Sequence, residues 1–275
     1  MAKASPQSDA SGRAAVHAAA REHAYDDYLA AILAPLPVRE DLVTLTAFYG
    51  EIAQIPLRVS EPALGEIRLQ WWRDALFSTD PTGNPVADAV QDLAARVKLP
   101  PGLLISPLEA RAAEVYPEPF PDEAAFRAYL DAAEGAALKA RAPVLAAGTP
   151  AANAAAGRLA EAAAVLSLTR FSVRLPQLLA RGRCPLNVGD LGPTTALGAD
   201  WKTLQPEIHK AVGARVAEAA RRLAVLKPEL SRISRDERMG LAPIALAGPY
   251  LRVLQGAGHD LTRDIAGLSP LERVT

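Results

Sequence analysis

The chain has 275 residues, and its 30 Lys and Arg residues nearly balance its 31 Asp and Glu residues, for a formal net charge of −1. Because no global positive field attracts phosphate backbones, a nucleic-acid-binding role is disfavoured and no nucleic acid is expected as a partner. The single cysteine, Cys184, excludes an intramolecular disulfide framework and any Cys-rich metal site. This cysteine usage fits a reducing compartment, so we expect a cytoplasmic protein.

No run approaches the roughly 20 consecutive apolar residues of a membrane span, so any membrane attachment is expected to be peripheral. Residues 1–20 are polar and rich in small residues and contain no apolar signal-peptide core, which predicts a disordered N-terminal segment. Nothing after them resembles a linker between domains. We therefore expect one domain over residues 21–260, followed by a polar tail at 261–275.

Apolar residues recur at helical spacing along the chain, runs of β-branched residues are absent, and most of the 23 prolines fall between the periodic segments. These patterns predict an all-α fold. The expected helices span about 23–33, 39–55, 61–76, 85–99, 103–116, 122–138, 150–182, 203–226 and 235–255.

Local signals predict several helix ends. Asn84 before a proline, and Asp122 after a proline-rich run, are typical N-cap residues. Gly182 stands where a C-cap glycine would end the helix that begins near residue 150. Pro56 is expected to end or kink the helix before it.

The stretch from Ala164 to Leu186 contains Arg170, Arg174 and Leu178, spaced by four residues, so a helix places these three on one face. Two like charges at this spacing repel each other, and the helix itself offers no reason for them. We therefore expect either a structural ion pair with a carboxylate of a neighbouring helix or a bound anion.

The other conspicuous side chains are expected to be structural. Trp71 and Trp72 fit core and rim packing at helical spacing, and Cys184 fits a packed thiol. The four histidines show no metal-ligand spacing, and neither a phosphate-binding loop nor a nucleophile elbow is present. We therefore predict no catalytic residues and no metal site from these groups.

Two segments resemble signatures of a known family. The early signature of the squalene/phytoene synthases is similar to residues 42–76, LVTLTAFYGEIAQIPLRVSEPALGEIRLQWWRDAL, through the run Trp71-Trp72-Arg73. The second signature of that family is similar to residues 164–186, anchored by Leu168-Thr169 and Arg181-Gly182-Arg183. The resemblance covers about residues 23–260 and implies an isoprenoid synthase fold, a single-domain helical bundle.

In that family, carboxylates on two facing helices hold Mg²⁺ ions that help to ionise a prenyl diphosphate. By the resemblance, the corresponding positions carry no carboxylate here. They are Ala53, Leu57, Arg170, Arg174 and Leu178, with Gln54 beside the first pair. Arginine cannot be a Mg²⁺ ligand, because its guanidinium carries only donors. The resemblance implies a degenerate site cavity without catalytic residues or cofactor, and Mg²⁺ is expected only if the protein is an enzyme.

The run EPALGEIRLQWW and the missing aspartates look most like the branch of the family that contains mitochondrial complex I assembly factor 6, a non-catalytic relative. This implies a pseudoenzyme that acts in assembly or interaction, with a protein partner such as a membrane-bound respiratory complex. Two alternatives remain open. A prenyltransferase of altered mechanism would grip a diphosphate through Arg39, Arg170 and Arg174, and a prenyl-lipid binder would keep the apolar tunnel without ionising a substrate.

Glu51 is the carboxylate nearest to the replaced positions on the first helix. Burying two guanidinium groups without partners would cost several kcal/mol each. We therefore expect Glu51, or failing that Glu61, to pair with Arg170 and Arg174 across the cavity, and we expect Glu51→Ala to destabilise the fold.

Overall fold

The computed structural model describes residues 6–148, 156–186 and 201–273, and every regular element within these ranges is a helix, as the sequence predicted. The first helices are α1 (Pro6–His23), α2 (Tyr25–Ile32), α3 (Leu36–Arg58), α4 (Pro62–Phe77), α5 (Pro85–Val97) and α6 (Gly102–Ala113). The next are α7 (Glu123–Leu130), the π-helical turn η1 (Asp131–Gly135), α8 (Ala136–Lys139), α9 (Arg141–Gly148) and α10 (Ala156–Leu179). The last are η3 (Trp201–Leu204), α11 (Gln205–Leu230), α12 (Arg235–Gly240), η4 (Ala242–Leu246) and α13 (Ala247–Leu254).

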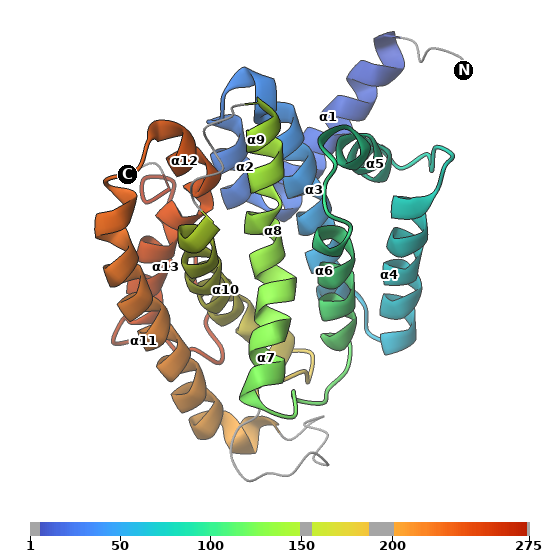
Figure 1. The fold of residues 1–275 in the computed structure, drawn as a ribbon. Coiled ribbons are helices and arrows are strands. Elements are labelled where there is room, and N and C mark those ends of the chain that lie inside the picture. Colours follow the sequence, from blue (N-terminus) through green and yellow to red (C-terminus); the bar gives the residue numbers. More distant parts are fainter. Residues whose placement is uncertain (1–5, 149–155, 187–200, 274–275) are drawn as a thin grey trace.

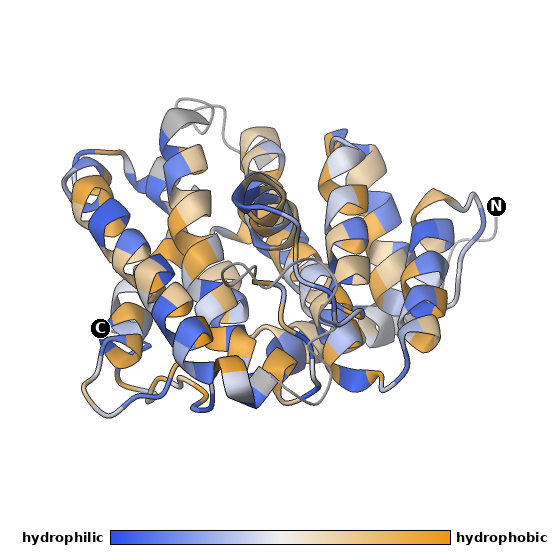
Figure 2. Cartoon of the chain, turned by 90° about the horizontal axis from the view of Figure 1, so that it is seen from below, coloured by the Kyte–Doolittle hydropathy of each residue, from blue (hydrophilic) through white to orange (hydrophobic). Residues whose placement is uncertain are grey.

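The apolar side chains form two cores. One is built mainly by α1 to α6 and α9 around Phe48 and Ile52 of α3, and the other by α7, α10, α11 and α13 around Phe171 and Leu175 of α10. In Figure 1, α11 and α13 lie on one side of the molecule and α4 and α5 on the other, with α7, α8 and α10 between them. Individual helices carry both hydrophobic and hydrophilic segments (Figure 2), as expected of helices that bury one face.

The expected disorder of residues 1–20 is wrong from Pro6 onward, because these residues belong to α1. Val16 and Ala20 are buried, and α1 packs along α3 and α5. Polar and charged residues lower the mean hydropathy of the segment, while its small alanine side chains allow two helix backbones to approach closely. A composition typical of a disordered segment therefore belongs here to a packed helix.

Three of the predicted helix ends are confirmed. The side chain of Asn84 accepts hydrogen bonds from two backbone N–H groups of α5, and Asp122 accepts one from Ala125 at the start of α7. Gly182 has a φ of 69°, the left-handed conformation that glycine adopts most readily after a helix. Pro56 does not end α3, which continues to Arg58.

Other boundaries differ from the prediction. The segment expected as one helix over 235–255 is divided into α12, η4 and α13, with Pro243 near the start of η4. The segment expected over 122–138 contains the π turn η1, which changes the direction of its side chains. The start of the long helix near Thr149 and the loop expected over most of 185–200 lie outside the described residues.

Residues after 260 do not form a separate polar tail. Leu261, Ala266 and Leu268 are buried, and Arg273 reaches back to Asp26 at the start of α2. The predicted boundary at residue 260 is therefore wrong. Of the helices in the described ranges, none is both long enough and apolar enough to cross a bilayer.

Candidate functional site

A cavity of about 360 Å³ opens between α2, α3, α10 and the π turn η1, with α13 and the C-terminal residues at its rim. Its polar walls come from charged side chains, and its apolar walls come mainly from α3 and α10. The ionisable lining residues other than tyrosines are His23, Asp26, Asp27, Arg111, Glu134, Arg170, Arg174 and Arg273.

Five of the residues expected around a degenerate site line this cavity. They are Ala53, Gln54 and Leu57 on α3, and Arg170 and Arg174 on α10. Leu178, one turn further along α10, is fully buried and does not line the cavity.

The expected position of Glu51 is wrong. Glu51 lines an adjacent groove between α3 and α4, together with Arg58 and Trp71, and burial raises the pKa of its carboxyl group. It lies two residues before Ala53, which is about 200° around the axis of α3, so the two side chains leave opposite sides of the helix. Glu61, the second candidate, precedes α4 and does not line the cavity either.

Arg39 is also not where the anion-site hypothesis expected it. Its Nε and Nη2 atoms donate hydrogen bonds to the carbonyl oxygen of Ala34, at 3.1 and 3.0 Å, and it does not line the cavity. Arg39 therefore satisfies a backbone carbonyl in the turn before α3.

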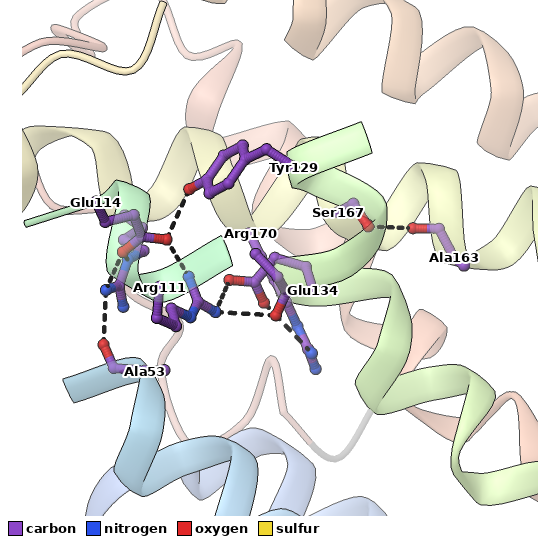
Figure 3. Close-up of polar contacts among 10 residues, drawn as sticks. Ala53, Arg111, Glu114, Tyr129, Glu134, Ala163, Ser167 and Arg170 are labelled. Carbon is purple, nitrogen blue, oxygen red and sulfur yellow. Dashed lines mark hydrogen bonds and ion pairs between the residues drawn. The ribbon is translucent and has the colours of Figure 1, made fainter. Parts of the chain in front are cut away.

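Arg174 is held by a buried carboxylate that the sequence did not single out. Its Nη2 atom donates to Glu114 Oε2 at 2.7 Å and to the carbonyl oxygen of Ala53 at 2.6 Å. The other oxygen of Glu114 accepts from Arg111, and from the hydroxyl of Tyr129 at 2.7 Å (Figure 3). One carboxylate thus accepts from two guanidinium groups and a phenol.

Arg111 extends this network to the π turn. It donates to Glu134 and to the carbonyl oxygen of Ala133. On the other side of Glu134 lies Arg170, whose Nη1 atom is 3.9 Å from Glu134 Oε2 and whose Nη2 atom donates to Asp27 of α2. Both arginines of the α10 face are therefore paired with carboxylates, although not with Glu51.

Burial and charge have opposite effects on the ionisation of this network. Burial alone would raise the pKa of Glu114, but the neighbouring Arg111 and Arg174 outweigh it, and the pKa is lowered. Burial likewise opposes the charge on Arg170, yet Asp27 and Glu134 raise its pKa. For Arg141 burial outweighs the attraction of Asp27 and lowers the pKa to about 10, and the side chain donates to backbone carbonyls.

A second ion pair closes the rim of the cavity. Asp26 accepts from Arg273 Nε at 2.7 Å and from the hydroxyl of Tyr250 at 2.5 Å. Burial, with Asp26 as a further cause, raises the pKa of Tyr250 to about 12, so its phenol keeps its proton and remains a donor. Asp26 is separated in the sequence from Tyr250 by 224 positions and from Arg273 by 247 positions, so these contacts join the N-terminal and C-terminal parts of the described chain.

The sequence analysis did not single out the three carboxylates that pair with Arg170 and Arg174, namely Asp27, Glu114 and Glu134. The adjacent pair Asp26-Asp27 was a usable signal, because two acidic residues open a helix there. Glu114 and Glu134 carry no comparable signal, since neither belongs to a spaced motif. The π turn that directs Glu134 toward the cavity is visible only in the structure.

The donor set of this cavity does not fit Mg²⁺. That ion requires near-octahedral oxygen coordination, and each of the carboxylates Asp27, Glu114 and Glu134 already pairs with a guanidinium. In the part of the chain that the structure describes, no three His, Cys, Asp or Glu side chains are grouped as metal ligands would be.

The all-α fold, with a central cavity walled by α3 and α10, is of the isoprenoid synthase type that the resemblance implied. The sequence model of the family described as squalene/phytoene synthase matches residues 20–274, so the chain belongs to that family. The resemblance found in the two signature segments is thereby confirmed.

Among curated proteins, the chain is similar to "NADH dehydrogenase (ubiquinone) complex I, assembly factor 6". It is 39% identical to the Bos taurus protein and 34% identical to the Homo sapiens protein, in each case over 70 residues. These matches cover 24% of this chain and 21% of each relative, so they span about a fifth of the length of the relatives.

Proposed function

We propose that the protein is a non-catalytic member of the squalene/phytoene synthase family that acts in assembly or interaction, in a manner related to complex I assembly. The observation that carries this proposal is the pairing of Arg170 and Arg174 with carboxylates inside the cavity. We further propose a cytoplasmic location with at most peripheral attachment to the membrane that holds its partner complex.

The pairing leaves little for a diphosphate to bind. A diphosphate needs metal ions or free cations, whereas the guanidinium groups of Arg111, Arg170 and Arg174 already have carboxylate partners. A ligand that displaced those partners would leave buried carboxylates such as Glu114 unpaired, which costs several kcal/mol. This supports a scaffold role over prenyltransferase chemistry, including the altered mechanism that relies on the same arginines.

The apolar part of the cavity favours a second candidate function, the binding of a prenyl lipid. Leu57, Leu166, Val173 and Leu246 line the same cavity as the ion pairs. Side chains of this kind bury an isoprenoid chain favourably, at about 25 cal/mol per Å². A neutral prenyl alcohol fits this wall better than a diphosphate, since it adds no charge beside the paired arginines.

Incubation with farnesyl or geranylgeranyl diphosphate and Mg²⁺ tests the proposal directly. We expect no release of pyrophosphate and no condensed product, because the described residues of the cavity offer no carboxylate pair free of an arginine. An active squalene synthase run in parallel provides the positive control. Turnover that exceeds the rate without protein would contradict the non-catalytic assignment.

The assembly role needs a cellular readout. We expect deletion of the gene to reduce fully assembled complex I on native gels, and re-expression of the intact chain to restore it. Unchanged complex I in the deletion strain would contradict this role while leaving the biochemical result above unaffected. Retention of farnesol or geranylgeraniol by the purified protein would instead favour the lipid-binding candidate.

A further inference from the structure

A second pocket, of about 520 Å³, lies where α3 and α10 end, away from the central cavity. It is lined by six residues: Arg58, Val59, Ser60, Ala180, Arg181 and Arg183. Three of them are arginines and none is a carboxylate. We call it the arginine pocket.

The turn after α10 fixes two of these arginines. The N–H groups of Gly182 and Arg183 donate to the carbonyl oxygens of Leu179 and Leu178, at 2.9 and 3.1 Å, which is the bonding pattern of a Schellman motif. The φ of 69° at Gly182 makes this reversal possible. Arg181 and Arg183 therefore flank a rigid turn rather than a freely moving loop.

Arg183 places a buried positive charge at the base of the pocket. It is 4% exposed, and its guanidinium donates to the carbonyl oxygens of Pro56 and Val59, at the end of α3. Among the residues that the structure describes, no carboxylate forms an ion pair with it. Burial, and then the neighbouring Arg181, lower its pKa, and Glu114 opposes this shift only in part.

The other two arginines can still bind a ligand. Arg181 is exposed, and its Nη1 atom donates a hydrogen bond to the carbonyl oxygen of Gln177, at 3.3 Å. Arg58 contacts Glu22 at 3.3 Å, but both side chains are at least half exposed, and such a pair contributes little and exchanges readily.

Helix dipoles do not neutralise the pocket. Each helix C-terminus carries roughly half an elementary negative charge, so the ends of α3 and α10 together offset about one of the three positive charges. Glu22 and Glu51 each offset part of the charge of Arg58, and Glu114 offsets part of the charge of Arg183. Because the lining itself contains three arginines and no carboxylate, the pocket still favours an anionic ligand.

We propose that the arginine pocket binds the phosphate group of a phosphorylated ligand, either a free phosphate compound or the headgroup of an anionic phospholipid. Guanidinium groups bind phosphate oxygens through paired N–H donors, and the Ser60 hydroxyl at the pocket wall adds a further donor. None of the three arginines lines the central cavity, so this site is independent of the proposed function.

A neighbouring surface separates the two possible sources of phosphate. Leu64, Ile67 and Trp71 of α4 are exposed on one face of that helix, and Ile67 and Trp71 share a groove with Arg58. Apolar side chains beside cationic ones are typical of surfaces that bind membranes by inserting into the lipid headgroup layer. This surface would contribute to binding only if the phosphate belongs to a lipid.

Calorimetric titration of the full chain with inorganic pyrophosphate forms the first arm of the test. We expect binding that Arg181→Gln weakens about tenfold, which corresponds to about 1.4 kcal/mol, and that Ser60→Ala weakens to a smaller extent. Both residues are exposed, so neither variant should unfold the protein. Arg263→Gln, which removes an exposed arginine outside the pocket, is the matched control and should bind like the unmodified chain.

Sedimentation with vesicles of phosphatidylcholine, with and without phosphatidylglycerol, forms the second arm. If the ligand is a lipid, we expect binding only with phosphatidylglycerol, loss of that binding in Arg181→Gln, and weaker binding in Ile67→Ser. If it is a free compound, only the pyrophosphate arm responds and Ile67→Ser has no effect. The proposal is overturned if neither probe binds, or if Arg181→Gln and Arg263→Gln bind equally well.

Discussion

Replacing Glu114 with glutamine is expected to lower the free energy of unfolding by about 3–5 kcal/mol, because the change removes the negative charge from a buried ion-pair network. Glu114 is 1% exposed and accepts from Arg111, Arg174 and the Tyr129 hydroxyl. Glutamine keeps the size of the side chain but leaves Arg174 without its carboxylate partner. Urea denaturation monitored by tryptophan fluorescence measures the effect.

The matched control is Glu109→Gln on α6, the helix that ends just before Glu114. Glu109 pairs with Arg73 at 3.5 Å, and both side chains are largely exposed. An exposed pair contributes about 0–1 kcal/mol, so this variant should unfold almost like the unmodified protein. If Glu114→Gln loses no more stability than Glu109→Gln, the buried network does not stabilise the fold as its geometry indicates.

Acid titration gives a second readout of the Glu114 variant. Because Arg111 and Arg174 hold the folded pKa of Glu114 below its ordinary value of 4.5 despite burial, the unfolded state binds a proton more readily than the folded state. The stability from this group is therefore complete above pH 4.5 and is lost as the pH falls through the folded pKa. Below pH 4.5 the unmodified chain should lose stability more steeply than Glu114→Gln.

The second large effect is expected for Phe171→Ala, which should lower the free energy of unfolding by about 3–5 kcal/mol through the cavity it creates. Phe171 follows Arg170 in sequence but points into the core of α7, α10 and α11, where its ring lies 5.0 Å from that of Phe126 in an edge-to-face arrangement. The same denaturation experiment measures this change.

Val225→Ala on α11 is the control for the core substitution. Val225 is 72% exposed, so its truncation should change the stability by no more than about 0.5 kcal/mol. A loss below about 1 kcal/mol for Phe171→Ala would mean that the core relaxes around the missing ring, contrary to the close packing described above.

Local features of the chain were predictable because their causes are local. Asn84 and Asp122 cap helices through their own side chains, and Gly182 ends α10 because glycine tolerates a positive φ. The helical periodicity that predicted an all-α fold belongs to the same class of signal. The order of the two family signatures then sufficed to place α3 and α10 on the cavity wall.

The identity of the partners of Arg170 and Arg174 was not predictable. The four-residue spacing indicated that a carboxylate or an anion must lie opposite, but it could not indicate which one. Asp27 is 143 positions from Arg170, and Glu114 is 60 positions from Arg174. Such pairs form only when distant helices pack together.

By itself, therefore, the sequence determined the all-α class, the caps and the need for charge compensation on the α10 face, since each depends on neighbouring residues or on a periodic pattern. The spacing of Glu51 and Ala53 already turns their side chains to opposite sides of a helix, but only the tertiary structure decided which face lines the cavity and that the face of Glu51 meets α4, because that depends on how distant helices pack. It also decided that α1 is ordered, because packing against α3 and α5 outweighs a composition that favours disorder.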